Sequence, residues 1–287
     1  MEGLARWALA FSVGFLAVRF LRVTTRDLFA APALQRENHR GARLPTAGGL
    51  LIVLAVLLVE AARAVIGAIG VGDEPGLDTP RSLVLFAVFA FALLGLIDDL
   101  LANGEARGFR GHVGEALRGR LSTGFLKLAG GGAVAVVLVA SPGFATGRRL
   151  IVDAVLIALC TNLGNLLDRA PGRTLKVGAL AYVPLAIALG GGAVGVAAAP
   201  VMGAAIALLG DDLRERLMLG DTGANVVGAV LGLAVVLGLD EPARLAVLAV
   251  VVLLNVAAEL VSFSAVIDRT PPLRALDHWG RPNRAVD

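Results

Sequence analysis

Aspartates interrupt the long apolar runs of this sequence at only a few points. Asp98 and Asp99 end one run, Asp168 ends another, and Asp221 opens a third. Adjacent residues on a helix point about 100° apart, so Asp98 and Asp99 cannot form one bidentate clamp. Carboxylates that gather repel one another unless a cation lies among them, and a hard divalent ion with oxygen ligands suits such a group.

These carboxylates therefore predict a site for a divalent cation, with Mg²⁺ favoured and Mn²⁺ as the alternative. The competing interpretation is that each aspartate merely ends an apolar helix at a water interface. For any single aspartate that interpretation is the stronger one. For the set of four we favour the metal site, because amide and lysine side chains accompany it.

Polar neighbours of the aspartates are candidates for binding a substrate. Lys127 follows a Ser-Thr-Gly segment at a predicted helix start, where an ammonium and free backbone N–H groups can meet a phosphate. Alternatively, Lys127 extends to the membrane interface. Asn162 and Asn165 share a helix face near Asp168 and either contact a ligand or bond to a neighbouring helix.

Weaker signals come from glycine, Glu259 and the histidines. The Gly48-Gly49 pair and the Gly220–Gly223 segment let backbone approach a ligand, although glycine also serves helix packing. Glu259 falls inside a predicted span and is either functional or neutral and hydrogen-bonded. Cys160 lies in an apolar run and is given no role, and the three histidines have no zinc-like spacing.

The composition indicates which elements position these side chains. Of 287 residues, 57% are hydrophobic and 17% are charged, whereas soluble domains have roughly 45–50% and 25%. This balance excludes a disordered chain, a disulfide scaffold and a coiled coil. The 36 glycines and few aromatics are typical of closely packed transmembrane helices. The basic residues are not clustered on a soluble domain, so we expect no nucleic-acid partner.

Apolar runs of about 20 residues, the length that spans a bilayer, predict an all-α, polytopic integral membrane bundle. A charge-free stretch over 177–210 is too long for one span and contains Gly190–Gly192, so we expect two helices joined there. The count is about nine transmembrane helices (range 8–10) in a single domain over 1–287. The other spans are expected near 4–22, 47–68, 82–101, 122–140, 150–167, 221–239 and 243–267.

Lysine and arginine predict the orientation of the bundle. Of the 26 basic residues, 19 fall in the connections after spans 1, 3, 5 and 7 or in the tail. Cytoplasmic loops carry such an excess, so we expect the N-terminus outside and the C-terminus in the cytoplasm. All the polar motifs fall on that cytoplasmic side. They predict one site built from helix ends in a multi-pass protein of the cell (plasma) membrane.

The motifs, in their order and spacing, resemble those of the polyprenyl-phosphate N-acetyl-hexosamine-1-phosphate transferase superfamily (glycosyltransferase family 4). The resemblance covers about residues 32–281. It rests on five segments: Pro45-Thr46-Ala47-Gly48-Gly49, Ile97-Asp98-Asp99, Leu121 to Lys127, Asn162-x-x-Asn165-Leu-x-Asp168, and Gly220-Asp221-Thr222-Gly223.

This resemblance implies a helical bundle with a cytoplasmic Mg²⁺ site. It implies transfer of a sugar-1-phosphate from a UDP-sugar to a polyprenyl phosphate, with release of UMP, in cell-envelope glycan synthesis. By this resemblance Asp98 or Asp99 would help deprotonate the lipid phosphate or hold the metal, and Asp221 would bind Mg²⁺. The implied catalytic residues are Asp98, Asp99 and Asp168, and the implied metal ligands are Asp221 and Asp98. The implied substrate-binding residues are Lys127, Asn162, Asn165, Arg169, Arg173, Arg274 and His278. A homodimer is left open.

The sequence departs from the family at two places. The family continues its Asn-Asp motif as Asp-Gly-x-Asp-Gly, but here Pro171 takes the place of the second Asp. The family also has a histidine cluster in its last cytoplasmic loop, and here only His278 is present. A catalytically degenerate member that binds polyprenyl phosphate or serves as a partner subunit is therefore the alternative function. A transporter is less favoured, because its binding groups should lie near mid-membrane.

Overall fold

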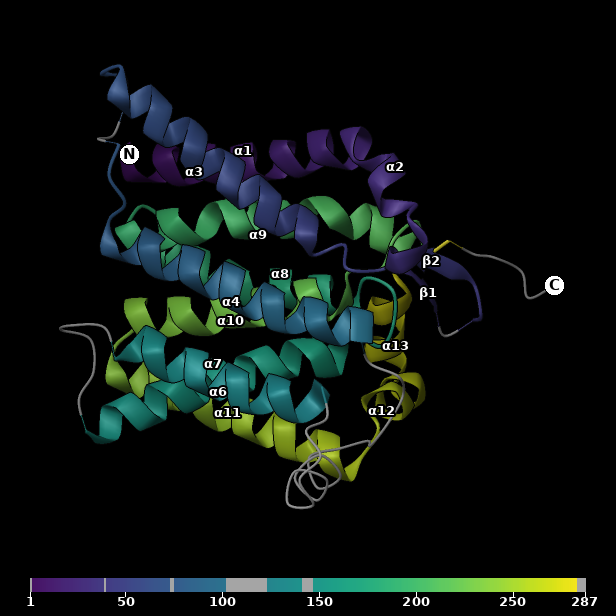
Figure 1. Cartoon of the computed structure of the whole chain (residues 1–287). Coiled ribbons are helices and arrows are strands. Elements are labelled where there is room, and N and C mark those ends of the chain that lie inside the picture. The colour runs from purple at the N-terminus through teal and green to yellow at the C-terminus, as the bar shows by residue number, and fades with distance from the viewer. Residues whose placement is uncertain (1, 39, 73–74, 102–122, 141–146, 283–287) are drawn as a thin grey trace.

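The computed structural model describes residues 2–38, 40–72, 75–101, 123–140 and 147–282, and within them the chain forms a bundle of nine long helices (Figure 1). The long helices are α1 (Glu2–Thr24), α3 (Leu50–Ala68), α4 (Thr79–Leu101), α6 (Thr123–Val139), α7 (Arg148–Leu167), α8 (Arg173–Leu189), α9 (Ala193–Leu213), α10 (Gly220–Gly238) and α11 (Glu241–Leu260).

Short elements gather at one end of the bundle (Figure 1). They are α2 (Arg26–Phe29), a 3₁₀ turn (Pro32–Leu34), the antiparallel strands β1 (Gln35–Glu37) and β2 (Arg43–Pro45), α12 (Phe263–Arg269) and α13 (Pro271–His278).

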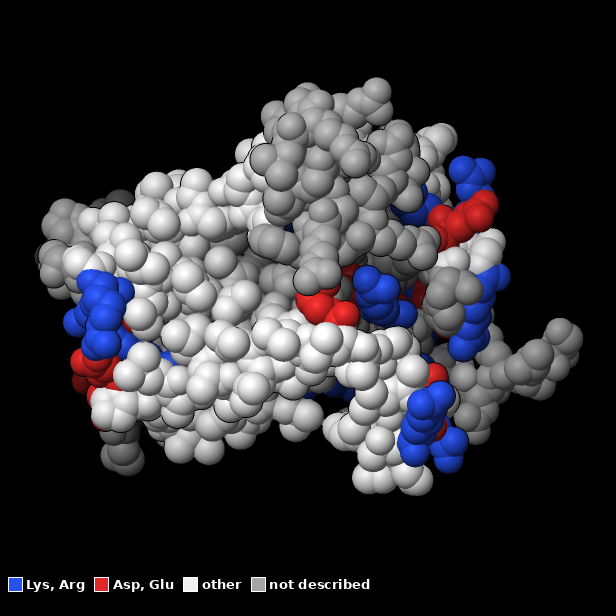
Figure 2. Space-filling model, turned by 90° about the horizontal axis from the view of Figure 1, so that it is seen from below, with Lys and Arg blue, Asp and Glu red and all other residues white. Residues whose placement is uncertain are grey.

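Seven helices of the described chain are long and apolar enough to cross a membrane: α1, α3, α4, α7, α9, α10 and α11. The other two long helices, α6 and α8, have 17 residues each. The protein is thus a multi-pass, all-α membrane protein, as predicted. Figure 2 shows charged side chains gathered toward the two ends of one face, with a broad uncharged band between them.

Each predicted span corresponds to one helix, but one boundary was wrong. The stretch over 177–210 does divide at the glycines, since α8 ends at Leu189 and α9 begins at Ala193. The last span, predicted to reach residue 267, ends at Leu260 instead. The chain is extended at Val261 and Ser262, and the Ser262 side chain then caps α12. The length of the apolar run did not reveal this break. The signal for it is Ser262, a residue type that often begins a helix.

Helices α9 and α10 form the centre of the bundle. They are the most buried of the spanning helices, with 72% and 83% of their apolar segments enclosed, against 17% for α1 and α11. Glycines allow the backbones to meet: a side chain at Gly95 of α4 would lie 2.4 Å from the Asp221 carbonyl oxygen of α10. Lipid tails are as apolar as leucine, so such close packing, rather than exclusion of water, holds membrane helices together.

Candidate functional site

Three of the predicted aspartates converge with Lys127 at the end of the bundle that carries the short elements. Asp98 lies near the end of α4, Asp221 in the first turn of α10, Lys127 near the start of α6, and Asp168 directly after α7. The Lys127 Nζ lies 3.4 Å from Asp98 Oδ2 and also contacts the Asp221 carboxylate. The ammonium therefore bridges two carboxylates that come from different helices.

Asp99 makes different contacts from its neighbour Asp98. Its carboxylate accepts hydrogen bonds from the backbone N–H groups of Asp221 (2.9 Å) and Thr222 (3.0 Å), and from the Thr222 hydroxyl (2.6 Å). The residue before α10, Leu219, has no side chain that can cap the helix, so Asp99 of α4 satisfies its free N–H groups. Both oxygens of Asp99 are thereby occupied, and Asp99 is placed to position Asp221 rather than to take a proton.

Asp168 is crowded by other carboxylates. Burial raises its pKa well above the ordinary value, and the negative charges of Asp212, Asp221 and Asp99 raise it further. A positive ion bound beside these groups would relieve the repulsion and favour the ionised form of Asp168. The electrostatics of the cluster therefore suit a cationic or metal-bound ligand.

Two pockets meet at this cluster. The outer pocket, of about 520 Å³, lies among the loops and is lined by residues that include Arg36, Asn38, Thr46, Pro171 and Asp212. The inner pocket, of about 420 Å³, extends between α4, α6, α7 and α10 and is lined by residues that include Lys127, Gly132, Asn162, Asn165 and Asn225. Both pockets share the side chains of Asp98, Asp168, Arg169 and Asp221. This shared wall is the point at which two ligands would touch.

The predicted substrate-binding residues divide into two groups. Arg169 lines both pockets, and Asn162 and Asn165 line the inner one. Arg173, Arg274 and His278 line neither pocket. Arg274 and His278 are exposed on α13, whereas Arg173 is only 4% exposed and faces α13.

Arg173 belongs to a buried ion-pair network, so its expected role at the substrate is not what the structure shows. Its Nε and Nη2 donate to both carboxylate oxygens of Asp277, at 2.8 and 3.0 Å. Arg281 also pairs with Asp277 at 2.9 Å and donates from Nε to the carbonyl of Pro171 at 3.0 Å. The network thus fastens α13 to the start of α8 and to the loop that follows Asp168.

Removing the acid at the centre of this network should undock α13. Burial by itself would raise the pKa of Asp277, but Arg173 and Arg281 outweigh burial and hold that pKa below its ordinary value of 3.8. The ion pairs therefore persist at neutral pH and are lost only as the pH falls below that value. We expect Asp277→Asn to lower the free energy of unfolding by about 3–5 kcal/mol, because the buried Arg173 and the half-buried Arg281 lose their anionic partner.

Thermal unfolding of the purified protein in detergent tests this expectation. Asp268→Asn is the matched control, because Asp268 is an exposed carboxylate on the neighbouring helix α12. Equal melting temperatures for the two variants would show that the network adds nothing to stability.

Several residues of the site were missed by the sequence argument. Arg36 follows the 3₁₀ turn and lines the outer pocket, as does Asp212 at the end of α9. Asp212 accepts hydrogen bonds from the N–H groups of Gly172 (2.8 Å) and Leu219 (3.3 Å), so it ties together the loops before α8 and α10. The Asp211-Asp212 pair ends an apolar run in the same way as Asp98-Asp99. This repeated pattern is the signal by which Asp212 could have been found in the sequence.

The two glycine motifs pack against each other, and Gly220 also lines the outer pocket. The N–H groups of Gly48 and Gly49 donate to the carbonyls of Met218 (3.0 Å) and Leu219 (2.9 Å). A side chain at Gly49 would come within 2.1 Å of the Gly223 nitrogen. Packing of Gly48 and Gly49 against Gly223 fixes the start of α3 against the start of α10. Gly220 lines the outer pocket, so both interpretations apply to the Gly220–Gly223 segment.

The donor set of the cluster fits Mg²⁺ as a partial site. In the part of the chain that the structure describes, no three His, Cys, Asp or Glu side chains form a ready-made metal cage. Mg²⁺, however, is usually held by one or two carboxylates together with substrate phosphates and water. The carboxylates of the cluster offer only oxygen donors, and burial together with the neighbouring negative charges raises the pKa of Asp168. Asp98 and Asp221, which face the same ammonium, are the pair that would hold the ion.

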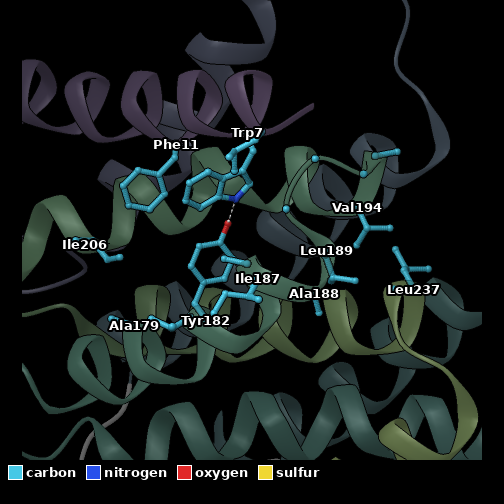
Figure 3. A pocket seen from close by; sticks show the side chains of 18 residues that line it. Trp7, Phe11, Ala179, Tyr182, Ile187, Ala188, Leu189, Val194, Ile206 and Leu237 are labelled. Carbon is cyan, nitrogen blue, oxygen red and sulfur yellow. Dashed lines mark hydrogen bonds between the residues drawn. The ribbon is translucent and has the colours of Figure 1, made fainter. Parts of the chain in front are cut away.

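A larger hollow lies at the opposite end of the bundle and has no charged lining (Figure 3). Its volume is about 940 Å³, and it lies between the first turns of α1 and the turn from α8 to α9. Its polar groups include the Trp7 indole N–H, which donates to the Tyr182 hydroxyl at 2.8 Å (Figure 3). These two groups satisfy each other, so the hollow offers no chemistry comparable with that of the carboxylate cluster.

Comparison with known proteins finds a similarity to a transferase. The chain is 29% identical over 199 residues to a protein named phospho-N-acetylmuramoyl-pentapeptide-transferase from Deinococcus radiodurans, a match that covers 65% of this chain and 59% of that relative. The chain thus spans less than two thirds of the relative's length. No family model matches it.

Proposed function

We infer that this chain, a divergent member of the polyprenyl-phosphate N-acetyl-hexosamine-1-phosphate transferase superfamily, is a phosphoglycosyl transferase. In the proposed reaction an oxygen of a polyprenyl phosphate attacks the sugar-bearing phosphorus of a UDP-sugar. A new P–O bond forms there, the bond to the bridging oxygen breaks, and UMP leaves with that oxygen. The product is a lipid-linked sugar diphosphate for cell-envelope glycan synthesis.

The observation that carries this proposal is the lysine-bridged carboxylate cluster at the junction of the two pockets. Lys127 contacts Asp98 and Asp221, and both carboxylates line both pockets. Phosphoryl transfer requires mainly that two anionic reactants be positioned and their charge neutralised. A lipid acceptor requires that the site lie where membrane-spanning helices end, as these residues do.

Each residue of the cluster has a role in this proposal. Asp98 and Asp221 would hold Mg²⁺, which when bound neutralises charge on the diphosphate. Lys127 and Arg169 bind phosphate oxygens by charge-assisted hydrogen bonds. Asp168, whose pKa is raised, is the candidate to accept a proton from the lipid phosphate. Asp99 positions Asp221 through the first N–H groups of α10.

Release of UMP from UDP-N-acetylhexosamines in the presence of polyprenyl phosphate tests the proposal. We expect purified protein in lipid vesicles to release UMP only when the lipid phosphate and Mg²⁺ are both present. Release from Lys127→Met should fall by about 100-fold, because loss of a group that neutralises transition-state charge typically costs that much. Arg148→Met is the control, since Arg148 is an exposed cation at the other end of α7.

The alternative is a degenerate member that binds polyprenyl phosphate without transferring a sugar. It is favoured by Pro171, whose carbonyl binds Arg281 and whose side chain offers no acceptor to a donor substrate. Binding of polyprenyl phosphate with no UMP release from any of the UDP-N-acetylhexosamines would support this alternative and contradict the transferase.

We also propose that the cluster faces the cytoplasm in the cell (plasma) membrane. The supporting observation is the excess of lysine and arginine in the connections at the cluster end. In intact cells an impermeant maleimide should label Leu77→Cys, which is exposed beyond α3, but not Arg214→Cys, which is exposed beyond α9. Labelling of Arg214→Cys before the cells are permeabilised would reverse the orientation.

A further inference from the structure

The inner pocket holds three asparagines, and among the residues that the structure describes only Asn162 is paired with another side chain. The Asn162 Nδ2 donates to Asn255 Oδ1 of α11 at 2.7 Å, and Asn255 donates in turn to the Val251 carbonyl at 2.8 Å. Asn162 therefore joins α7 to α11. Of the two interpretations open for this residue, contact with a neighbouring helix is the one observed.

Asn165 and Asn225 differ from Asn162 in a way that points to a ligand. Each has a buried side-chain oxygen without a hydrogen-bond partner in the described chain. Asn225 is fully buried, one helical turn beyond Asp221, and its Nδ2 lies 3.4 Å from the Phe91 carbonyl oxygen. An unpaired carbonyl in the interior of a membrane bundle destabilises the fold. An unpaired side-chain oxygen beside an open pocket is explained if a bound ligand donates a hydrogen bond to it.

The facing wall of the inner pocket leaves room for such a ligand. It is formed by α6, where Gly131 and Gly132 have no side chains. A Cβ atom added at Gly132 would meet no atom within 4 Å. The space of about 420 Å³ is therefore not filled by side chains of the described bundle.

The chemistry of the walls selects the kind of ligand. Asn165, Asn225, Glu259 and the shared carboxylates present hydrogen-bond acceptors, while Lys127 and Arg169 lie at the end where the two pockets meet. An ionised phosphate offers acceptors only, so it suits Lys127 and Arg169 but not the amide oxygens. A sugar offers hydroxyl groups, and an N-acetyl sugar also offers an amide N–H.

We propose that the inner pocket binds the sugar ring of the donor, with Asn225 and Asn165 accepting hydrogen bonds from its hydroxyl or amide groups. The outer pocket then takes the nucleoside, and the diphosphate lies at the shared wall. This assignment rests on the proposed transferase function. It names two specificity residues, of which Asn225 follows the Gly-Asp-Thr-Gly motif.

The test compares Asn225→Leu with the wild-type protein in two measurements. Leucine has the same branched arrangement of side-chain heavy atoms and no polar atom, so the ligand-free variant should melt at a higher temperature than wild type. Wild type should bind UDP-N-acetylglucosamine about 10-fold more tightly than UDP, and the variant should bind both equally. Asn165→Leu, at a less enclosed position, should behave in the same way if Asn225→Leu does not fold. Asn255→Leu is the control for stability and should lower the melting temperature, because Asn255 is paired.

Four outcomes would overturn the inference, and the last of them also removes its premise. Lower melting temperatures for Asn225→Leu and Asn165→Leu would make both asparagines structural. Higher melting temperatures with an unchanged preference for the UDP-sugar would place the sugar elsewhere. Wild-type protein that binds UDP and UDP-N-acetylglucosamine equally would refute the sugar site alone, whereas wild-type protein that binds neither would also refute the proposed function.

Discussion

Asp221→Asn should reduce UMP release by about 100-fold or more at every Mg²⁺ concentration. The substitution keeps the size of the side chain but removes the charge that faces Lys127 and would hold the metal ion. The backbone N–H of residue 221 still binds Asp99, so the start of α10 should remain intact. Initial rates in lipid vesicles across a Mg²⁺ titration, together with a melting curve, measure both effects.

Asp240→Asn is the matched control for this substitution. Asp240 precedes α11 at the opposite end of the bundle, where its side chain accepts a hydrogen bond from the Ala243 N–H at 3.1 Å. Asparagine caps a helix as well as aspartate does, so this variant should retain both stability and turnover. The metal assignment is wrong if Asp221→Asn turns over at a near-normal rate at low Mg²⁺.

Gly95→Ala should destabilise the bundle, although it adds only one methyl group. The added carbon would lie 2.4 Å from the Asp221 carbonyl oxygen and 2.5 Å from the Thr222 nitrogen, and a backbone cannot move aside as a side chain can. We expect a loss of about 1–3 kcal/mol in the free energy of unfolding. Because α4 carries Asp98 and Asp99, the same shift should move them away from α10 and lower activity.

Gly132→Ala gives the comparison, since Gly132 is also a glycine inside a long helix of the bundle but faces open space. There alanine should raise stability by roughly 0.5–1 kcal/mol, the usual difference between these residues in a helix. Denaturant or thermal unfolding of both variants in the same detergent tests the opposite signs. A Gly95→Ala protein as stable as wild type would mean that α4 and α10 do not need their close approach.

The sequence by itself was sufficient to predict the helices of the bundle and the end at which the polar motifs gather. Both are local properties: a run of about 20 apolar residues is a potential span, and a polar residue that ends such a run lies near an interface. The glycines at 190–192 were sufficient to divide the long apolar stretch into α8 and α9. The break after Leu260 was missed, because the apolar run was followed past Ser262, the residue that caps the next helix.

Only the tertiary structure decided what each member of a similar pair of residues contacts. Asp98 contacts Lys127 whereas Asp99 caps α10, and Asn162 is paired whereas Asn165 is not. Arg173 and Arg169 are four residues apart, yet one is fixed by Asp277 and the other lines both pockets. Each partner lies on a helix far away in the sequence. No local spacing can reveal such partners, because they depend on which helices the glycine contacts bring together.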